Sequence, residues 1–175
     1  MKNNKLYNLI SCALGASIIA ILGPLTIPIG PVPLSLCSLA IMLIAGVTGA
    51  KNGTISTLIY IALGVIGLPI FSSFRAGLGT LTGPTGGYII GYIILAVIAG
   101  FAFRRNISRP LCVVILVLAN TALYSLGTVW LCIYMDYTCM QGLLTGVIPF
   151  IAGDIVKIVI AFFTVPAIKR RIQTR

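Results

Sequence analysis

The sequence contains no histidine and only two acidic residues among its 175 residues. Without histidine there is no His-centred catalytic triad, no HExxH zinc site and no histidine proton relay. Two carboxylates cannot build an oxygen-rich Ca²⁺ or Mg²⁺ cage from side chains. The five cysteines contain no CxxC pair, which excludes a zinc ribbon and a thioredoxin-like motif. We therefore expect no metal site, and these absences argue against an enzyme.

Charge is scarce as well, since 8% of the residues are charged whereas soluble domains have about a quarter. Hydrophobic residues make up 59% of the chain, and its mean hydropathy is +1.13. Six stretches approach the roughly 20 apolar residues that a membrane-spanning helix needs. They are residues 6–23, 34–50, 53–68, 86–103, 110–131 and 147–168. We expect an all-α membrane protein in which residues 1–175 form a single domain of six transmembrane helices.

The basic residues indicate how these helices are oriented. If the N-terminus is cytoplasmic, the inner segments contain Lys2, Lys5, Lys51, Arg104, Arg105, Arg109, Lys169, Arg170, Arg171 and Arg175. Of the 12 basic residues, this leaves Arg75 in an outer loop and Lys157 within the last helix. The positive-inside rule therefore predicts that both termini are cytoplasmic in a multi-pass protein of the plasma membrane. Nucleic-acid binding is not expected, because the basic residues are scattered at helix ends without stacking aromatics.

The first outer loop, residues 23–36, is rich in proline, and each proline fixes φ and prevents a regular helix. The loop should be extended, and it is also apolar. Two interpretations remain open. The loop could be a lid over a cavity, or it could rest on the surface of the bilayer.

The second outer loop, residues 69–87, contains five glycines and ends where the fourth helix begins. Free backbone N–H groups at a helix start can receive an anion. The same loop carries Arg75, the single basic residue predicted to lie outside. Arg75 and Gly86 therefore predict a site for a carboxylate, with contact to a lipid headgroup as the alternative.

The last predicted helix contains Asp154 and Lys157, which are three residues apart and share one helix face. A charge at the centre of a bilayer costs about 2.5–3.5 kcal/mol on insertion scales, so such residues face a polar interior and find partners. The functional interpretation is a binding site for a polar, mostly neutral head group. The alternatives are a structural ion pair and, more weakly supported, a proton relay. Asp136, in the short outer loop 136–146, is expected to be solvated.

Several motifs then resemble one known family. They are GLPIF at 67–71, RAGLG at 75–79, GPTGGY at 83–88, GPVPLSL at 30–36 and PFIAGDIVK at 149–157. Together, in this order and over most of the chain, they resemble the BioY biotin transporters, the substrate-binding (S) components of energy-coupling factor (ECF) transporters. Similar proteins usually have Gln where this chain has Cys37, and Pro where it has Ala152.

The resemblance implies a function in biotin uptake and a role for each site residue. Asp154 would accept hydrogen bonds from the ureido ring of biotin, and Lys157 would donate to its oxygen. Ser73 could add a hydroxyl contact, while Arg75 and Gly86 would receive the valerate carboxylate. Tyr88 and Tyr92, one helical turn apart, could form the wall beside the apolar part of the ligand, with plain interfacial packing as the alternative. Other candidates are an S component for a different vitamin, and a small channel or carrier unrelated to vitamins.

The resemblance also implies partners, namely a membrane coupling subunit and two cytoplasmic ATPases. No GxxxxGK[ST] loop is present, so ATP would be hydrolysed by the partners and no cofactor is expected in this chain. In S components the first helix docks on the coupling subunit through small residues. Ala16 and Ala20 supply such a pattern, which permits close approach of two helices.

Overall fold

The computed structural model describes residues 4–29, 31–104 and 106–173, which are mostly helical. In chain order the elements are α1 (Asn4–Leu22), β1 (Thr26–Ile27), β2 (Leu34–Ser35), α2 (Cys37–Thr48), α3 (Ala50–Ile66), the 3₁₀ turn η1 (Ser72–Phe74), α4 (Leu78–Thr82), α5 (Gly86–Ala102), α6 (Arg109–Met135), α7 (Cys139–Gly146) and α8 (Ile148–Gln173). Lys2, Gly30, Arg105 and Arg175, which entered the sequence argument, lie outside the described residues.

Each of the six predicted stretches corresponds to one apolar helix. Three are long and apolar enough to cross a membrane, over Lys5–Leu22, Arg109–Met135 and Ile148–Ile172. The helices α2, α3 and α5 are apolar but shorter, at 12, 17 and 17 residues. The prediction of a mostly helical chain with membrane-type helices is therefore confirmed. The count of six spans and the side of the termini stay predictions.

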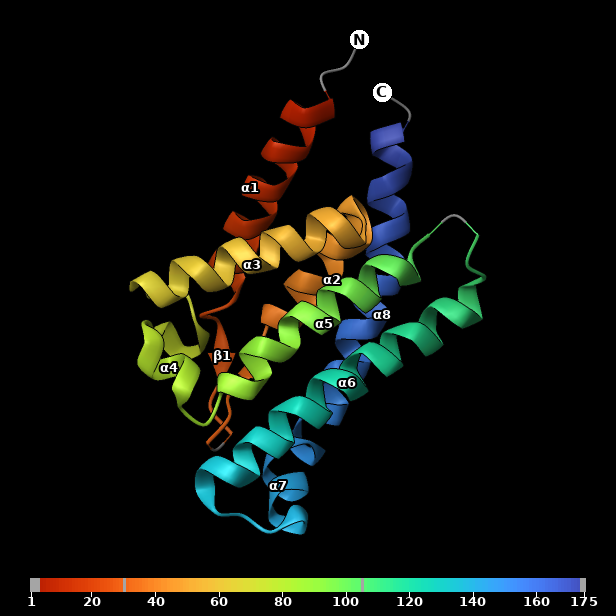
Figure 1. The fold of residues 1–175 in the computed structure, drawn as a ribbon. Coiled ribbons are helices and arrows are strands. Elements are labelled where there is room, and N and C mark those ends of the chain that lie inside the picture. The colour runs from red at the N-terminus through yellow and green to blue at the C-terminus, as the bar shows by residue number, and fades with distance from the viewer. Residues whose placement is uncertain (1–3, 30, 105, 174–175) are drawn as a thin grey trace.

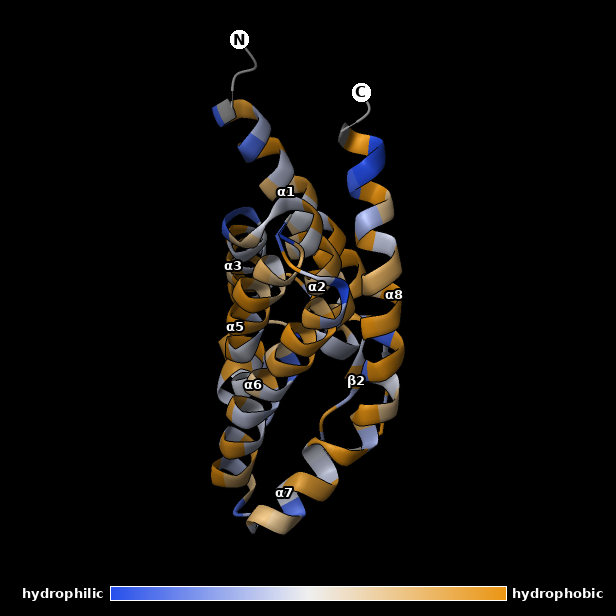
Figure 2. Ribbon diagram, turned by 90° about the vertical axis from the view of Figure 1, so that its right-hand side faces the viewer, coloured by the Kyte–Doolittle hydropathy of each residue, from blue (hydrophilic) through white to orange (hydrophobic). Residues whose placement is uncertain are grey.

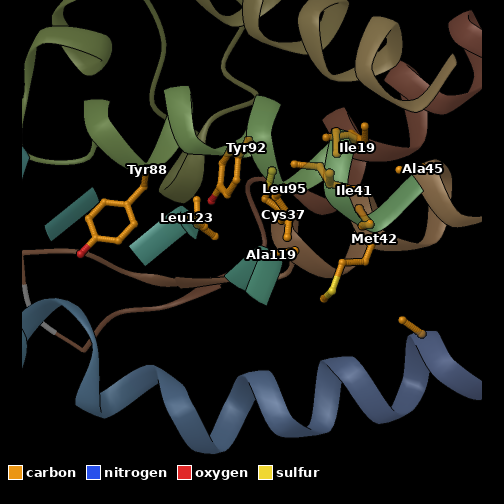
Figure 3. Packing of buried hydrophobic residues seen from close by; sticks show 14 of the residues in the cluster. Ile19, Cys37, Ile41, Met42, Ala45, Tyr88, Tyr92, Leu95, Ala119 and Leu123 are labelled. Carbon is orange, nitrogen blue, oxygen red and sulfur yellow. The ribbon is translucent and has the colours of Figure 1, made fainter. Parts of the chain in front are cut away.

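Helix α2 lies at the centre of the molecule and contacts α1, α3, α5 and α8, while α5 packs along α6. Its side chains Ile41 and Met42 are fully buried. Figure 3 shows them beside Ile19 of α1 and Leu95 of α5. Apolar packing of this kind holds the bundle together. The two ends of the chain lie at one end of the bundle and α7 lies at the opposite end (Figure 1).

The proline-rich first loop folds back on itself as a small antiparallel sheet. Thr26 pairs with Ser35 and Ile27 pairs with Leu34. The hydroxyl of Ser35 closes the base of the loop by donating to the carbonyl of Gly23 at 2.8 Å. The sequence predicts an extended segment here, and the structure adds that the two extended arms pair. This pairing is an exception to the all-α prediction.

The outer segment 136–146 is a correction to the sequence analysis, because the structure forms helix α7 over Cys139–Gly146 where a loop was expected. A capping box starts this helix. The Thr138 side chain accepts from the backbone N–H of Gln141, and the Gln141 side chain accepts from the backbone N–H of Thr138. Such a box satisfies backbone donors at a helix start and thereby stabilises even a short helix. Asp136 is exposed before it, as predicted.

Candidate ligand-binding site

Asp154 and Lys157 form a buried ion pair on α8. The Lys157 ammonium donates to Asp154 Oδ1 at 3.0 Å, and the two residues are 5% and 6% exposed. Their spacing of three residues on one helix makes this contact local, as the sequence predicted. Two charges in a low-dielectric interior require further hydrogen bonds, because their mutual attraction alone does not offset desolvation.

Two other helices supply these bonds. The Tyr124 hydroxyl on α6 donates to Asp154 Oδ2, and the Lys157 ammonium also donates to the Ser38 hydroxyl on α2 at 3.0 Å. Each carboxylate oxygen therefore has one donor, and the ammonium has two acceptors. A carboxylate oxygen can accept a second bond and an ammonium has three donors, so this cluster keeps capacity for a ligand.

A cavity, which we call the outer cavity, opens beside this cluster. It has about 40 Å³ of space for the centres of water molecules. Its polar lining residues are Lys157 and seven residues with hydroxyl side chains, namely Ser35, Ser38, Ser72, Thr85, Tyr88, Tyr92 and Tyr124. Its apolar lining comes from Val32, Pro33, Leu34, Ile89, Leu123 and Phe150. A few polar groups in a mostly apolar and aromatic wall are typical of small-molecule sites.

Aromatic rings form one side of the outer cavity. Tyr88 meets Tyr124 edge to face with ring centroids 6.4 Å apart, and Tyr124 stacks on Phe150 at 6.3 Å. Tyr88 and Tyr92 project from the same helix, α5 (Figure 3). The Tyr88 ring packs so closely on Gly127 that a Cβ at that position would overlap it. The glycine therefore lets α6 approach α5 at the site.

The first loop covers the outer cavity. Val32, Pro33 and Leu34 line it, which fits the lid interpretation of this apolar segment. The lid is joined to the second loop by a hydrogen bond of 2.9 Å between the hydroxyls of Thr26 and Ser73. The two loops are thus linked to each other beside the outer cavity.

The structure brings some predicted site residues together and leaves others apart. Lys157 and Tyr88 line the outer cavity, and Asp154 is bonded to two of the lining residues. Ser73 and Arg75 are exposed on the second loop and do not line the cavity, although the neighbouring Ser72 does. Their roles toward a ligand stay predictions.

Gly86 is buried at the start of α5, and its backbone N–H donates to the carbonyl of Gly83 at 3.0 Å. A Cβ there would overlap the carbonyl of Leu81. The close approach of the Leu81 carbonyl therefore explains why residue 86 is a glycine. Thr85, which precedes Gly86, is the part of this helix start that lines the outer cavity. The proposed role of Gly86 in receiving an anion stays a prediction.

The residues predicted to dock on a partner lie on the inner side of α1. Ala16 is 2% exposed and Ala20 is partly buried, so the chain's own helices cover much of this face. α1 packs mainly against α3. The exposed side of α1 carries Leu14, Ile18 and Ile21. Docking through Ala16 and Ala20 stays a prediction.

The sequence analysis missed Tyr124, Ser38 and Thr85 as site residues. Tyr124 lies 30 positions from Asp154, and Ser38 lies 119 positions from Lys157. No local spacing connects these pairs, so only the packing of α2, α6 and α8 shows them. Across the described residues, no three His, Cys, Asp or Glu side chains gather to hold a metal ion.

Comparisons with known proteins agree with this geometry. The family model described as "BioY family" matches residues 1–174. Biotin transporter BioY2 of Lactococcus lactis subsp. cremoris (strain MG1363) is 34% identical over 161 residues, which cover 91% of this chain and 88% of that protein. Biotin transporter BioY of Thermotoga maritima is 33% identical over 153 residues, covering 87% and 90% of the two chains.

A solved structure is similar over the whole chain. It is the crystal structure of the S-component for biotin from an ECF-type ABC transporter, with a TM-score of 0.85 and 30% sequence identity. The match covers 100% of this chain and 95% of that one. The described fold is therefore shared with a solved protein.

Proposed function

The chain belongs to the BioY family, as its motifs indicated, and from this membership we propose that it is a biotin-uptake protein, the substrate-binding component of an ECF transporter. The family consists of transporter components, so the role is binding and transport rather than catalysis. The observation that carries the proposal within this chain is the buried Asp154–Lys157 pair, because Lys157 lines the outer cavity.

The chemistry of biotin matches the donors and acceptors of this site. Its ureido ring has two N–H donors and one carbonyl oxygen. Asp154 accepts an N–H in addition to its bond from Tyr124, and Lys157 gives its remaining donor to the ureido oxygen. Charge-assisted bonds of this kind are about twice as strong as neutral ones. An analogue that lacks the ureido ring cannot make these additional bonds and should bind more weakly.

The residues that line the outer cavity indicate where the rest of the ligand can lie. The apolar thioether ring fits between Tyr88, Tyr92 and Phe150. The valerate then leads toward the outer loops, where Arg75 can receive its carboxylate. Gly86 can do so only if its N–H leaves the carbonyl of Gly83. Ser73 provides a hydroxyl at the same mouth.

Binding requires movement of the lid. One water molecule requires about 10–15 Å³ of such cavity volume. The outer cavity has about 40 Å³, so a bicyclic ligand does not fit unless the cavity expands. The segment that can yield is the hairpin of β1 and β2, because it is a short two-stranded ribbon of the kind that is only marginally stable by itself. The bundle beneath it is closely packed.

The membrane arrangement completes the proposal. The chain spans the plasma membrane six times with both termini in the cytoplasm, because this places most cations inside. A membrane coupling subunit docks on α1 near Ala16 and Ala20, and two cytoplasmic ATPases supply the energy, since the chain has no phosphate-binding loop. Transport follows when the loaded chain reorients so that the outer cavity opens inward.

Calorimetric titration of the purified full chain with biotin, thiamine and riboflavin tests this function. Biotin is expected to bind tightly and stoichiometrically, and the other two are expected not to bind. Thiamine is cationic and would sit beside the ammonium of Lys157. Tight binding of another vitamin would support the alternative of a different S component. No binding, together with ion flux through vesicles, would support a channel or carrier.

A further inference from the structure

A second cavity, which we call the inner cavity, lies at the end of the molecule that carries both termini. It has about 360 Å³ of space on the same measure as the outer cavity, so it is far roomier. Three segments line it: the end of α5 with the turn that follows, the start of α6, and the second half of α8. The biotin site at the other end does not use any of these residues.

Basic side chains converge on the inner cavity from all three segments. They are Arg104 after α5, Arg109 at the start of α6, and Lys169 on α8. Arg170 also lines the cavity, but it has contacts of its own and is not counted in this cluster. Lys169 donates to the carbonyl of Phe103 at 2.8 Å, and the Arg104 guanidinium lies over the ring of Phe101 at 4.2 Å. These contacts hold the two cations at the cavity but do not neutralise them. Figure 2 shows the hydrophilic last turns of α8 at this end, above an apolar middle.

No acidic side chain can balance this charge. The chain has two acidic side chains in all, and both are elsewhere. Asp154 is paired with Lys157 and lies 15 residues before Lys169, which is about 22 Å along a helix. Asp136 caps the far end of α6, about 40 Å from Arg109. The cluster therefore favours an anion from outside the chain.

The start of α6 also favours a bound anion at this cavity. Arg109 is the first residue of this 27-residue helix, and the side chain of Ser108 before it makes no capping bond. The helix dipole is positive at this end, so a cation there is unfavourable and a bound anion is favourable. This feature adds to the cavity and its cations and does not replace them.

The remaining lining is apolar, and this decides the class of ligand. Phe103, Phe162, Phe163 and Pro166 line the same cavity, and Phe163 is 67% exposed on the outer surface of the bundle. A free inorganic anion would leave these surfaces unused. A phosphate attached to an acyl chain would use the cations and the apolar wall together, as basic pockets between membrane helices do.

We propose that the inner cavity binds one anionic phospholipid of the inner leaflet, with its phosphate at Arg104, Arg109 and Lys169 and an acyl chain along Phe163 and Pro166. The lipid supplies the counter-charge that the acidic side chains do not provide, and it joins α8 to the α5–α6 turn. This site does not depend on biotin, and its failure leaves the proposed function intact.

Native mass spectrometry of the full chain in detergent tests the proposal with phosphatidylglycerol, phosphatidylcholine and inorganic phosphate as probes. We expect one phosphatidylglycerol per chain at concentrations at least tenfold below those needed for phosphatidylcholine. Each positive charge removed should weaken this binding about fivefold. The double variant Arg109→Gln/Lys169→Gln should therefore lose most of the preference, and Arg109→Gln alone should lose part of it.

Lys51→Gln is the matched control, because Lys51 is an exposed cation at the start of α3 outside the inner cavity. It should keep the full preference, and all variants should keep biotin binding. Equal binding of the two lipids, competition by inorganic phosphate at similar concentration, or an equal loss in Lys51→Gln would each overturn the proposal. Arg109→Gln keeps the Lys169 contact to the end of α5, so the test survives if the double variant does not fold.

Discussion

The Lys157 ammonium on α8 donates to the Ser38 hydroxyl on α2 at 3.0 Å, although the two residues are 119 positions apart. Ser38 is the second residue of α2, which follows the lid hairpin directly. The buried ion pair is therefore attached to the helix that carries the lid. A ligand that bonds to Lys157 therefore contacts the group that holds the start of α2, next to the lid. Through this contact, ligand binding can change the position of the lid.

Asp154→Asn should weaken biotin binding at least tenfold in calorimetry, because Asn replaces the charged acceptor with a weaker one. It should also lower the melting temperature, since a buried Lys157 without its partner costs about 3–5 kcal/mol. Asp136→Asn is the control, as it removes the other acid at an exposed position, and it should change neither quantity. A folded Asp154→Asn protein with unchanged affinity would remove Asp154 from the site.

Tyr124→Phe keeps the ring between Tyr88 and Phe150 but removes the donor to Asp154. Hydrogen bonds to charged groups contribute about 1.5–3 kcal/mol, so the free energy of unfolding should fall by about this amount. The affinity for biotin should also fall, because the Asp154 carboxylate is no longer held in place by the hydroxyl. Tyr134→Phe, at an exposed position on the same helix, should have no effect. Equal affinities for the two variants would show that the hydroxyl does not orient the carboxylate.

The double variant Thr26→Cys/Ser73→Cys should lock the lid, because the two native hydroxyls are 2.9 Å apart. Stopped-flow binding of biotin should slow strongly under oxidising conditions and recover after reduction. Each single cysteine variant is a control for the native thiols and should bind at the same rate in both conditions. Unchanged binding by the oxidised, cross-linked protein would mean that the ligand enters without lid movement.

Gly127→Ala should destabilise the protein by about 1–3 kcal/mol and weaken biotin binding, because the new methyl overlaps the Tyr88 ring and displaces it. Gly79→Ala is a matched control on helix α4, where the added methyl would have no atom within 4 Å. Both changes raise helix propensity similarly. Thermal melting of the two variants thus isolates the contact with Tyr88, and equal melting temperatures would contradict it.

Arg75→Ala should weaken biotin more than the neutral amide of biotin, because only the acid has a charged tail. Arg75→Lys keeps the charge and should restore most of the difference. Arg75 is exposed on the second loop, so this effect requires that the loops rearrange around the ligand. Equal losses for the acid and the amide would assign Arg75 to loop structure.

Two kinds of site feature could be predicted from the sequence: those that depend on local spacing and those that depend on the free-energy cost of a charge in the membrane. Asp154 and Lys157 stood out because charge inside an apolar helix is expensive, and their contact spans three residues. The motifs predicted the family, which the comparisons confirmed. Tyr88 lines the outer cavity, while its contact with a ligand stays a prediction.

The sequence could not predict what depends on how helices meet. Tyr124 sits in an apolar helix like any interfacial tyrosine, and only the approach of α6 to α8 brings it to Asp154. The failure to predict helix α7 has a different cause, because the sequence does contain a capping signal for it. Thr138 and Gln141 have the spacing of a capping box, but a helix of eight residues with several small or polar side chains resembles a loop in sequence.

The pairing of Asp154 with Lys157 has an electrical consequence for transport. Opposite charges 3.0 Å apart cancel, so in the proposed reorientation this pair would carry no net charge across the membrane field. Biotin adds one negative charge from its tail. An inside-negative voltage opposes inward transfer of that charge by about 2.3 kcal/mol per 100 mV. If the chain reorients as proposed, this ion pair would therefore add nothing to the electrical work of uptake, whereas the charge of biotin would.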